Sequence, residues 1–367
     1  MLIYNEMIGQ WVNQNSKRSI DKTEGYYTYS NGNKYLDTQM GNSSFIFGYN
    51  DKRILDAISN SSVDFLHSSK TSDTLNSVTK KLLELSKMST VLWSHSGSDA
   101  VESAVALNDR YWDIVDPTKK KIITIENNYH GATYLTKAMR GEVSLDRFII
   151  TKDFGIQAAI DETVGAVIVE SIPWLHGVNP RSKQWWINLR DLCTNRNINL
   201  IVDDVAGSFG KLGYAFSTDR YNISADIIAT SKAITAGYVP FGATFANKKI
   251  VDVLKDSNWS HSHTYNPSAY AIEACNCVLE RLDEFNNIPR LEENLSDIFF
   301  HTGLESCNIG LVGELKLPTT KSPEQYWKAG LELNIYVPDR FIIVMPVIAN
   351  EEYFFRLATS IRTLLSL

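Results

Sequence analysis

The residue whose surroundings most suggest chemistry is Lys232. It follows a short apolar run, residues 226–230, that has the composition of a buried strand, and Gly237 comes soon after it. A lysine in such a position is expected to be partly desolvated, which lowers the pKa of its amine and makes the amine available for Schiff-base formation. Most lysines are solvated surface groups, and only its context distinguishes Lys232 from them.

Two carboxylates, Asp203 and Asp204, end another buried run, residues 200–203. In open α/β sheets ligands bind beyond the carboxyl ends of the strands, and an acid there needs a partner such as a cationic ring nitrogen, a metal or an arginine. Asp203 is the better candidate for such a role. The alternative is that both carboxylates only hold a nearby loop. The glycines of residues 207–213 fit no nucleotide-binding spacing, so we expect a turn there.

A third feature, residues 94–102, joins a turn of small residues to an amphipathic helix. Ser96, Gly97 and Ser98 stand where the first backbone N–H groups of that helix are free and where its dipole is positive, which suits a phosphate. The alternative is a serine that caps an ordinary helix.

Other kinds of site have little support in the sequence. The histidines do not stand at the helical spacing of metal ligands with an acid beside them, and no Gly-x-Ser-x-Gly elbow occurs. The four cysteines are too few for a disulfide scaffold, and Cys275 and Cys277 lie in an apolar helical stretch. We therefore expect reduced thiols and no bound metal.

The elements that would position these residues alternate between strands and helices. Four short apolar runs have the composition of strands buried on both faces: residues 121–125, 166–170, 200–203 and 226–230. Helical periodicity separates them, as at residues 100–112 and 184–195. This alternation is typical of an α/β fold with a mainly parallel sheet and helices on both of its faces.

We predict two domains. Residues 50–265 are expected to form the large α/β domain, and residues 1–49 and 266–367 together a smaller α+β domain. The N-terminal part is rich in Tyr, Asn, Gly and Ser, which favours turns and short antiparallel strands, and residues 341–345 form a run of strand type.

Composition and charge exclude several classes of protein. Hydrophobic residues make up 44% and charged residues 21% of the 367, as in globular proteins. A net charge of −6 argues against binding to nucleic acid or to an anionic membrane. Residues 1–11 lack the basic and apolar regions of a leader, and no apolar run approaches about 20 residues. We expect a cytoplasmic protein.

The order of these motifs resembles that of the class III aminotransferases, which have fold type I of the pyridoxal 5′-phosphate (PLP) enzymes. The resemblance extends over nearly the whole chain, from residue 32 to Pro346. Its motifs are Ser-Gly-Ser-Asp-Ala-Val-Glu at 96–102, Tyr129-His-Gly131, Glu170, Asp203-Asp-Val205, Lys232 and His263-Thr-Tyr-Asn-Pro267. The resemblance implies PLP as cofactor.

The resemblance also implies roles for the catalytic residues. Lys232 is expected to form the Schiff base with PLP and to move protons as general acid and base. Asp203 is expected to pair with the ring nitrogen and keep it protonated. Tyr129 is expected to stack on one face of the pyridine ring, and Val205 to pack against the other.

Further residues are implied to bind the cofactor. Gly97 and Ser98 are expected to hold the phosphate, and His130 and Glu170 belong to the same binding set. Thr264 is expected to reach the phosphate of the neighbouring subunit, which would make the protein a homodimer with shared active sites.

One departure from the family bears on the substrate. Many members place an arginine shortly before a Pro-Pro pair to bind the substrate α-carboxylate, but residues 342–346 contain none. Arg340 lies two residues away, a displacement of about 7 Å along a strand. We therefore expect a substrate other than an ordinary α-amino acid, unless Arg340 compensates. Four further side chains are candidates for the substrate entrance, with core packing as the alternative: Phe45, Phe47, Trp174 and His176.

The leading hypothesis is an aminotransferase that moves an amino group from a small-molecule amine or amino acid donor to a carbonyl acceptor. An aminomutase of the glutamate-semialdehyde type, on the same scaffold, is the alternative, because it needs the same Lys232, Asp203 and Tyr129. A non-catalytic protein of the PLP fold is a third hypothesis, and the presence of Lys232 argues against it.

Overall fold

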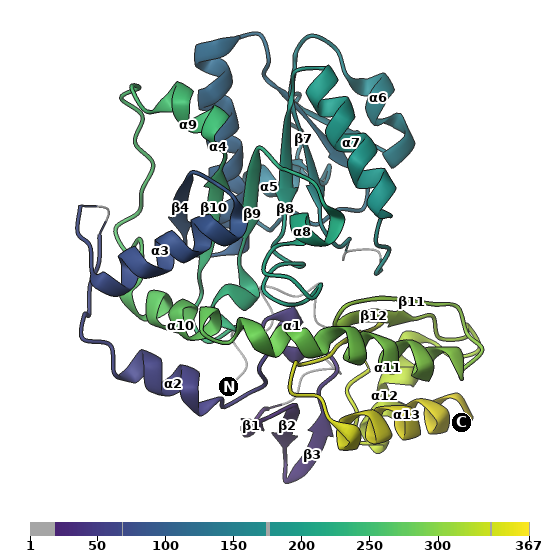
Figure 1. Cartoon of the computed structure of the whole chain (residues 1–367). Coiled ribbons are helices and arrows are strands. Elements are labelled where there is room, and N and C mark those ends of the chain that lie inside the picture. Colours follow the sequence, from purple (N-terminus) through teal and green to yellow (C-terminus); the bar gives the residue numbers. More distant parts are fainter. Residues whose placement is uncertain (1–18, 68, 174–176, 338–339, 367) are drawn as a thin grey trace.

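A computed structural model of the chain describes residues 19–67, 69–173, 177–337 and 340–366. It has two lobes, one above the other in Figure 1. The larger lobe is built on a seven-stranded sheet in the order β4-β10-β9-β8-β7-β5-β6. Its strands are β4 (Thr90–Ser94), β5 (Lys121–Ile125), β6 (Phe148–Thr151), β7 (Val164–Glu170), β8 (Asn199–Asp203), β9 (Ile227–Thr230) and β10 (Gly242–Ala246).

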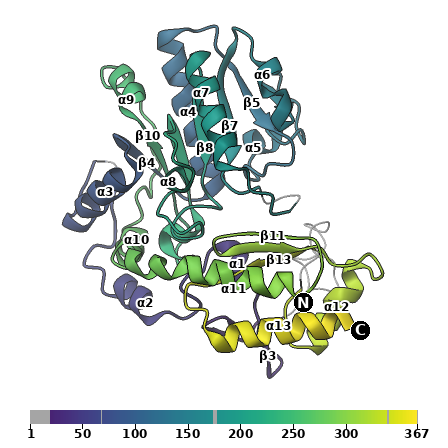
Figure 2. The same cartoon turned by 45° about the vertical axis from the view of Figure 1, so that its right-hand side comes forward.

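The sheet is mainly parallel, as predicted. The pairs from β9 through to β6 are parallel, whereas β10 runs antiparallel to both of its neighbours, β9 and β4. The four strands that the sequence predicts are β5, β7, β8 and β9. They are buried along their length because helices cover both faces of the sheet (Figure 2).

Helices lie between the strands in the chain. They are α3 (Asp73–Ser86), α4 (Gly97–Val115), α5 (Tyr134–Ala138), α6 (Ile156–Ala159), α7 (Lys183–Asn195), α8 (Ser217–Tyr221) and α9 (Lys248–Leu254), with short 3₁₀ turns η2 (Asp153–Gly155) and η3 (Lys232–Thr235). The helices predicted at 100–112 and 184–195 correspond to α4 and α7.

Strand alternation divides the apolar side chains between two cores. On one face, Ile122, Ile168 and Ile201 pack with the buried side of α4. On the other face, Val167 and Val202 belong to the main core of the molecule, together with residues of α7. Successive side chains of a strand point to opposite faces, so each strand contributes to both cores.

The smaller lobe brings the two ends of the chain together. It contains two antiparallel sheets, one of β1 (Lys22–Glu24), β2 (Tyr27–Ser30) and β3 (Asn33–Leu36), the other of β11 (Ser306–Ile309), β12 (Val312–Leu315) and β13 (Phe341–Val344). Its helices and the connecting turns are α1 (Met40–Ser43), α10 (Ala269–Leu279), η4 (Leu282–Asn287), α11 (Ile288–Phe300), α12 (Pro323–Glu332) and α13 (Glu351–Ser366). Helix α2 (Lys52–Ser59), at the start of the predicted larger domain, packs against α10.

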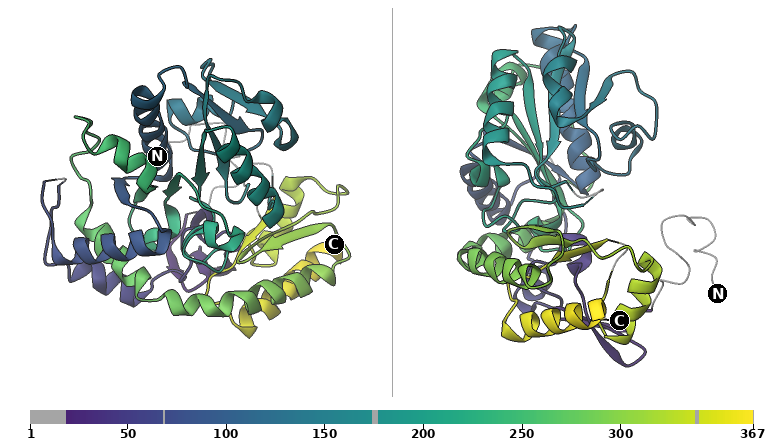
Figure 3. Two further views of the ribbon diagram at one scale, coloured as in Figure 1. Left: turned by 45° about the horizontal axis from the view of Figure 1, so that its top comes forward. Right: turned by 90° about the vertical axis from the view of Figure 1, so that its right-hand side faces the viewer.

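Backbone hydrogen bonds join these ends directly. Leu36 N donates to Asn334 O at 2.9 Å, and Val344 N donates to Thr38 O at 2.7 Å. Figure 3 shows the smaller lobe packed beneath the sheet of the larger one. We propose that the domain boundaries are those predicted, with residues 50–265 as the larger domain and 1–49 with 266–367 as the smaller.

No helix in the described part of the chain is long and apolar enough to cross a membrane.

Candidate active site

One cavity of about 170 Å³ lies at the carboxyl ends of the parallel strands. It brings together eight of the nine predicted site residues. The residues that line it are Ser96, Gly97, Ser98, Tyr129, His130, Gly131, Glu170, Asp203, Val205, Ala206, Ser231 and Lys232. Residues more than 130 positions apart in the chain meet here because parallel strands end at the same edge of the sheet.

Asp203 is positioned by strand register. It is the last residue of β8 and pairs with Glu170, the last residue of β7, so the two side chains stand side by side. His130 Nδ1 lies 2.8 Å from Asp203 Oδ2, and Val205 N donates to Asp203 Oδ1 at 3.2 Å. These contacts fix the orientation of a carboxylate that is only 2% exposed.

Glu170 is the second buried acid of the site. Its Oε2 accepts a 2.6 Å hydrogen bond from Tyr129 N, and its own N–H donates to Asn128 Oδ1 at 3.0 Å. Burial raises the pKa of Glu170 well above its usual range, and the charge of Asp203 raises it further. Glu170 therefore ties the loop that carries Tyr129 to the end of β7.

Lys232 follows β9 by two residues and begins the turn η3. The protein encloses its side chain apart from the cavity that it lines. Burial lowers the pKa of the amine, and the charges of Glu170 and Asp203 oppose that shift. The backbone of Lys232 has a φ of 50°, in the left-handed region that few residues other than glycine adopt. An unprotonated lysine amine in this place can attack a carbonyl carbon.

The start of α4 forms another part of the cavity wall. Ser96 caps the helix by accepting a hydrogen bond from Asp99 N at 3.2 Å. Ser98 Oγ accepts one from Ala132 N at 3.1 Å, which holds the loop after His130 against the helix. A Cβ atom on Gly97 would lie 2.8 Å from a methyl of Val205, so only glycine leaves room between them.

Tyr129 has a neighbour that the sequence does not indicate. The Arg140 guanidinium carbon lies 4.6 Å from the centre of the Tyr129 ring, and the Arg140 side chain is 4% exposed. Arg140 also pairs with Glu142 at 3.1 Å. A cation at this distance from an aromatic ring stabilises the ring in its position.

Four residues of the cavity lie outside the predicted set: Ser96, Gly131, Ala206 and Ser231. Each is next in the chain to a predicted residue, and Ser96 belongs to the turn that suggests a phosphate site. Their position next to a predicted residue is therefore the feature of the sequence by which these four residues could have been found.

Other predicted residues lie elsewhere. Thr264 is exposed, and it is not among the described residues that line the cavity of its own chain. The Arg340 side chain is 45% exposed, lies 4.0 Å from Glu314 and borders a different groove. Phe47 is a core residue, 2% exposed, and Phe45 packs on Tyr238 with ring centres 5.2 Å apart. Trp174 and His176 lie outside the described residues.

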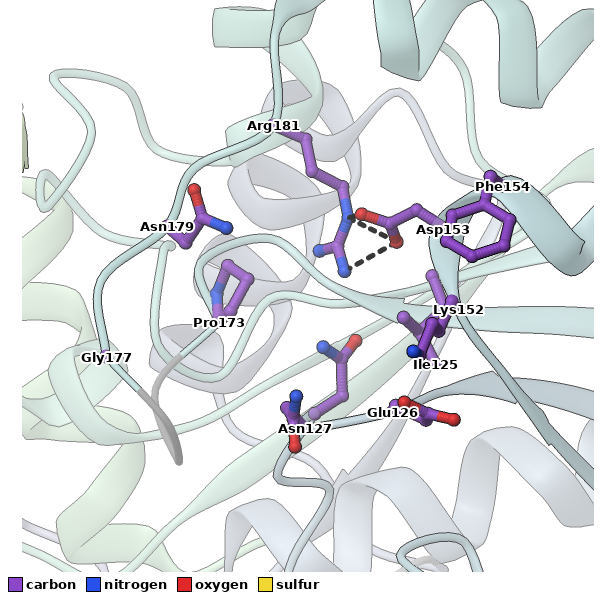
Figure 4. A pocket seen from close by; sticks show the side chains of 11 residues that line it. Ile125, Glu126, Asn127, Lys152, Asp153, Phe154, Pro173, Gly177, Asn179 and Arg181 are labelled. Atoms are coloured by element: carbon purple, nitrogen blue, oxygen red, sulfur yellow. Dashed lines mark hydrogen bonds and ion pairs between the residues drawn. The ribbon is translucent and has the colours of Figure 1, made fainter.

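A second cavity of about 300 Å³ adjoins the first. Figure 4 shows Arg181 paired with Asp153 in this cavity, which Asn127 also lines; Arg181 Nη2 lies 2.9 Å from Asp153 Oδ1. Asn128, whose side chain bonds to Glu170, lines this second cavity as well. The loop of residues 126–131 thus separates two cavities at the same end of the sheet.

The described residues include no group of three or more His, Cys, Asp or Glu side chains that could hold a metal ion. The chemistry of the first cavity instead fits PLP. Lys232 supplies an amine for an aldehyde, the start of α4 supplies free N–H groups for a phosphate, and Asp203 supplies a buried carboxyl group for a ring nitrogen. Because Gly97 has no side chain, its backbone lies directly against Val205 and the start of α4 stays open to a ligand in the cavity.

Fold and site together define a class, the PLP-dependent transferases of fold type I. Solved structures support the fold. An amine transaminase from an uncultivated Pseudomonas species, in its PLP-bound form, aligns with a TM-score of 0.88 at 21% identity, over 98% of this chain and 97% of that one. An omega-transferase from Vibrio fluvialis aligns with a TM-score of 0.86 at 21% identity, over 95% and 99%.

The family is shown by sequence. The model of the class III aminotransferases matches residues 10–147 and 147–306, so this chain belongs to that family and is a PLP-dependent aminotransferase. Its relatives include gamma aminobutyrate transaminase 2 of Solanum lycopersicum, 29% identical over 85% of this chain and 80% of the relative. Vanillin aminotransferase of Capsicum annuum is 28% identical over 83% and 77%. The family that the motifs indicate is thereby confirmed.

Proposed function

We propose that this enzyme transfers an amino group from an amine or amino acid donor to a carbonyl acceptor, with Lys232 as the residue that attaches PLP through a Schiff base. When bound, PLP supplies an electron sink that stabilises negative charge on the substrate carbon. The observation that carries the proposal is the meeting of the Lys232 amine, the Asp203 carboxylate and the start of α4 around one cavity.

The remaining roles follow from position. Lys232 lines the cavity, so its amine would be placed to move a proton between two carbon atoms of the reacting groups. Asp203, held by His130, is placed to keep a ring nitrogen protonated. Tyr129, backed by Arg140, provides a stacking surface, and Ser98 with the N–H groups of α4 provides the phosphate site.

The substrate nitrogen need not be next to a carboxylate. Supporting this, residues 342–346 contain no arginine, and Arg340 faces Glu314 at the edge of another groove. The names of the relatives agree, because neither gamma aminobutyrate nor vanillin is an α-amino acid. An amine or an ω-amino acid is therefore the proposed donor.

A single-turnover experiment separates the aminotransferase from the aminomutase. Enzyme loaded with PLP is mixed with one donor and no acceptor, and the products are counted. An aminotransferase releases one carbonyl product per site and leaves the cofactor as the pyridoxamine form. Conversion of the donor into an isomer without loss of its nitrogen would instead indicate the mutase. Lys232→Ala serves as control, and a protein that takes up no PLP would overturn the cofactor assignment.

We also propose a homodimer with shared active sites and a cytoplasmic location. Thr264 is exposed and is not among the described residues that line the cavity of its own chain, so its side chain is available to a neighbour. Several plant relatives are named as mitochondrial, so the location needs its own test. Expression of a tagged protein followed by cell fractionation tests it.

A further inference from the structure

Lys211 is a fully buried lysine outside the cavity. It lies in the turn-rich loop after β8, and it is 0% exposed. Its Nζ donates to Ser43 O at 3.1 Å, and its own carbonyl accepts from Leu311 N at 2.8 Å. A single side chain and its backbone thus join the large lobe to both the N-terminal and the C-terminal parts of the small lobe.

The segment that Lys211 contacts is unusual in its backbone. The residues of α1 form one left-handed turn, with φ of 45° at Met40, 58° at Gly41, 54° at Asn42 and 69° at Ser43. This conformation is unfavourable for residues other than glycine, so tertiary contacts must hold it. The Asp37 carboxylate accepts from the N–H groups of Gln39 and Met40 at the start of the turn. At the end of the turn, the Lys211 amine donates to the carbonyl oxygen of Ser43.

The residues directly after this turn pack against the segment that follows Lys232. A Cβ atom on Gly237 would lie 2.9 Å from both Ser44 and Phe45, the residues directly after the turn. Gly237 N in turn donates to Lys232 O at 3.3 Å. The Lys211 amine is therefore linked to the backbone of Lys232 by successive contacts, first with residue 43, then through residues 44–45 to Gly237.

We propose that Lys211 is a positioning residue: it fixes the left-handed turn of residues 40–43 against the segment after Lys232 and so limits access of water to the Lys232 amine. This role is separate from the cofactor contacts described above, because Lys211 does not line the cavity.

Electrostatics agree with the geometry. Burial and the nearby charge of Lys232 hold the pKa of Lys211 well below its usual range, whereas Asp204 opposes the shift. The charged groups that act on Lys232 itself are Glu170 and Asp203, which favour its protonated form. The lowered pKa reduces the positive charge that Lys211 places beside Lys232, and the amine can donate to Ser43 O in either protonation state.

The first test is hydrogen–deuterium exchange of the protein without added cofactor, so it does not depend on the proposed function. Lys211→Met keeps the length and apolar stem of the side chain but removes the donor. We expect residues 37–49 to exchange about tenfold faster, the size of one lost buried hydrogen bond. Residues 121–125 of the central sheet should be unchanged. Equal exchange of residues 37–49 in a folded variant would overturn the proposal.

Two control variants distinguish loss of this hydrogen bond from a general loosening of the fold. Lys211→Arg keeps a donor and should restore slow exchange. Lys81→Met removes another lysine that donates to a backbone carbonyl, Leu279 O at 2.6 Å, and should leave residues 37–49 unchanged. If Lys211→Met does not fold, the measurement is made in a Ser43→Gly background, where glycine tolerates the positive φ. Wild-type exchange rates in that double variant would also overturn the proposal.

The second test rests on the proposed function and reads the state of Lys232. The visible absorption band that forms when PLP is added is followed against pH. Lys211→Met should raise the midpoint of uptake by about one pH unit, a tenfold change in protonation, because a more hydrated amine keeps its proton to higher pH. An unchanged midpoint, or one that Lys211→Arg fails to restore, contradicts the proposal. Absence of the band in wild type would refute the proposed function instead.

Discussion

At the scale of single residues, the site is governed by two buried acids on neighbouring strands. Asp203 and Glu170 stand side by side at the ends of β8 and β7, and each is nearly free of solvent. Two adjacent carboxylates in an interior do not ionise equally. Asp203 has His130 and a backbone N–H as partners, whereas burial and the Asp203 charge raise the pKa of Glu170. Of the two acids, Glu170 is therefore the one whose pKa burial and the neighbouring charge raise.

This difference predicts a pH dependence of stability. In the folded protein Glu170 holds a proton that the unfolded chain releases above its ordinary pKa of 4.5. Stability should therefore fall as pH rises above that value, with a slope of up to about 1.4 kcal/mol per pH unit until the raised pKa is passed. Glu170→Gln, which can still accept from Tyr129 N, should remove that component. Urea unfolding without cofactor between pH 4 and 8 measures it.

The outcome that would contradict this prediction is a parallel pH profile for wild type and Glu170→Gln. Glu126→Gln, at an exposed position of the neighbouring loop, is the control and should keep the wild-type profile.

A second prediction at this scale concerns Asp203. Asp203→Asn keeps the shape of the side chain but not the negative charge that would hold a ring nitrogen protonated. We expect the rate of the first half-reaction to fall about 10²- to 10³-fold with little change in folding. Stopped-flow absorbance with excess PLP and donor measures it. Asp204→Asn, one residue further along and outside the cavity, should lose much less, and equal losses in the two variants would argue against the assigned role.

At the scale of elements, the start of α4 decides whether a phosphate can bind. Its first residue, Gly97, faces Val205 across the cavity wall, with space for no added methyl group. The helix dipole and the free N–H groups can bind a phosphate only if no side chain at the start of α4 keeps the ligand away from them.

Gly97→Ala should therefore weaken PLP binding rather than the fold, because alanine favours a helix. We expect about a tenfold loss of affinity, measured by equilibrium dialysis with PLP. The double variant Gly97→Ala/Val205→Ala removes the methyl groups that alanine would meet, and should bind as well as Val205→Ala alone. No recovery in the double variant would place the cause elsewhere.

At the scale of the whole molecule, the exposed Thr264 distinguishes a site within one chain from a shared site. Lys232→Ala and Thr264→Ala are each expected to bind PLP poorly. In a hybrid dimer of the two, one site combines an intact Lys232 with an intact Thr264 from the partner. Refolding a mixture of the variants should thus restore native affinity at one site of each hybrid. A mixture that behaves as the average of its parents would indicate that Thr264 serves no neighbour.

Four strands of the central sheet could be predicted from the sequence, whereas strand β10 and the contact of Arg140 with Tyr129 could not. The runs that became β5, β7, β8 and β9 were found because a strand buried on both faces must be continuously apolar. β10 was missed because its alternation of small residues, Gly242–Ala246, resembles a loop until its two neighbours cover it. Arg140 was missed because nothing in its local sequence places it against Tyr129.

The sequence by itself determined the order of the motifs, the family and eight of the residues that line the cavity, since each motif needs particular residue types next to one another in the chain. Tertiary structure alone decided the electrostatics. The raised pKa of Glu170, the contact of His130 with Asp203 and the hold of Lys211 on residue 43 arise between segments distant in sequence. Burial and charge depend on neighbours in space, and those are set only when the strands are paired and the lobes are packed.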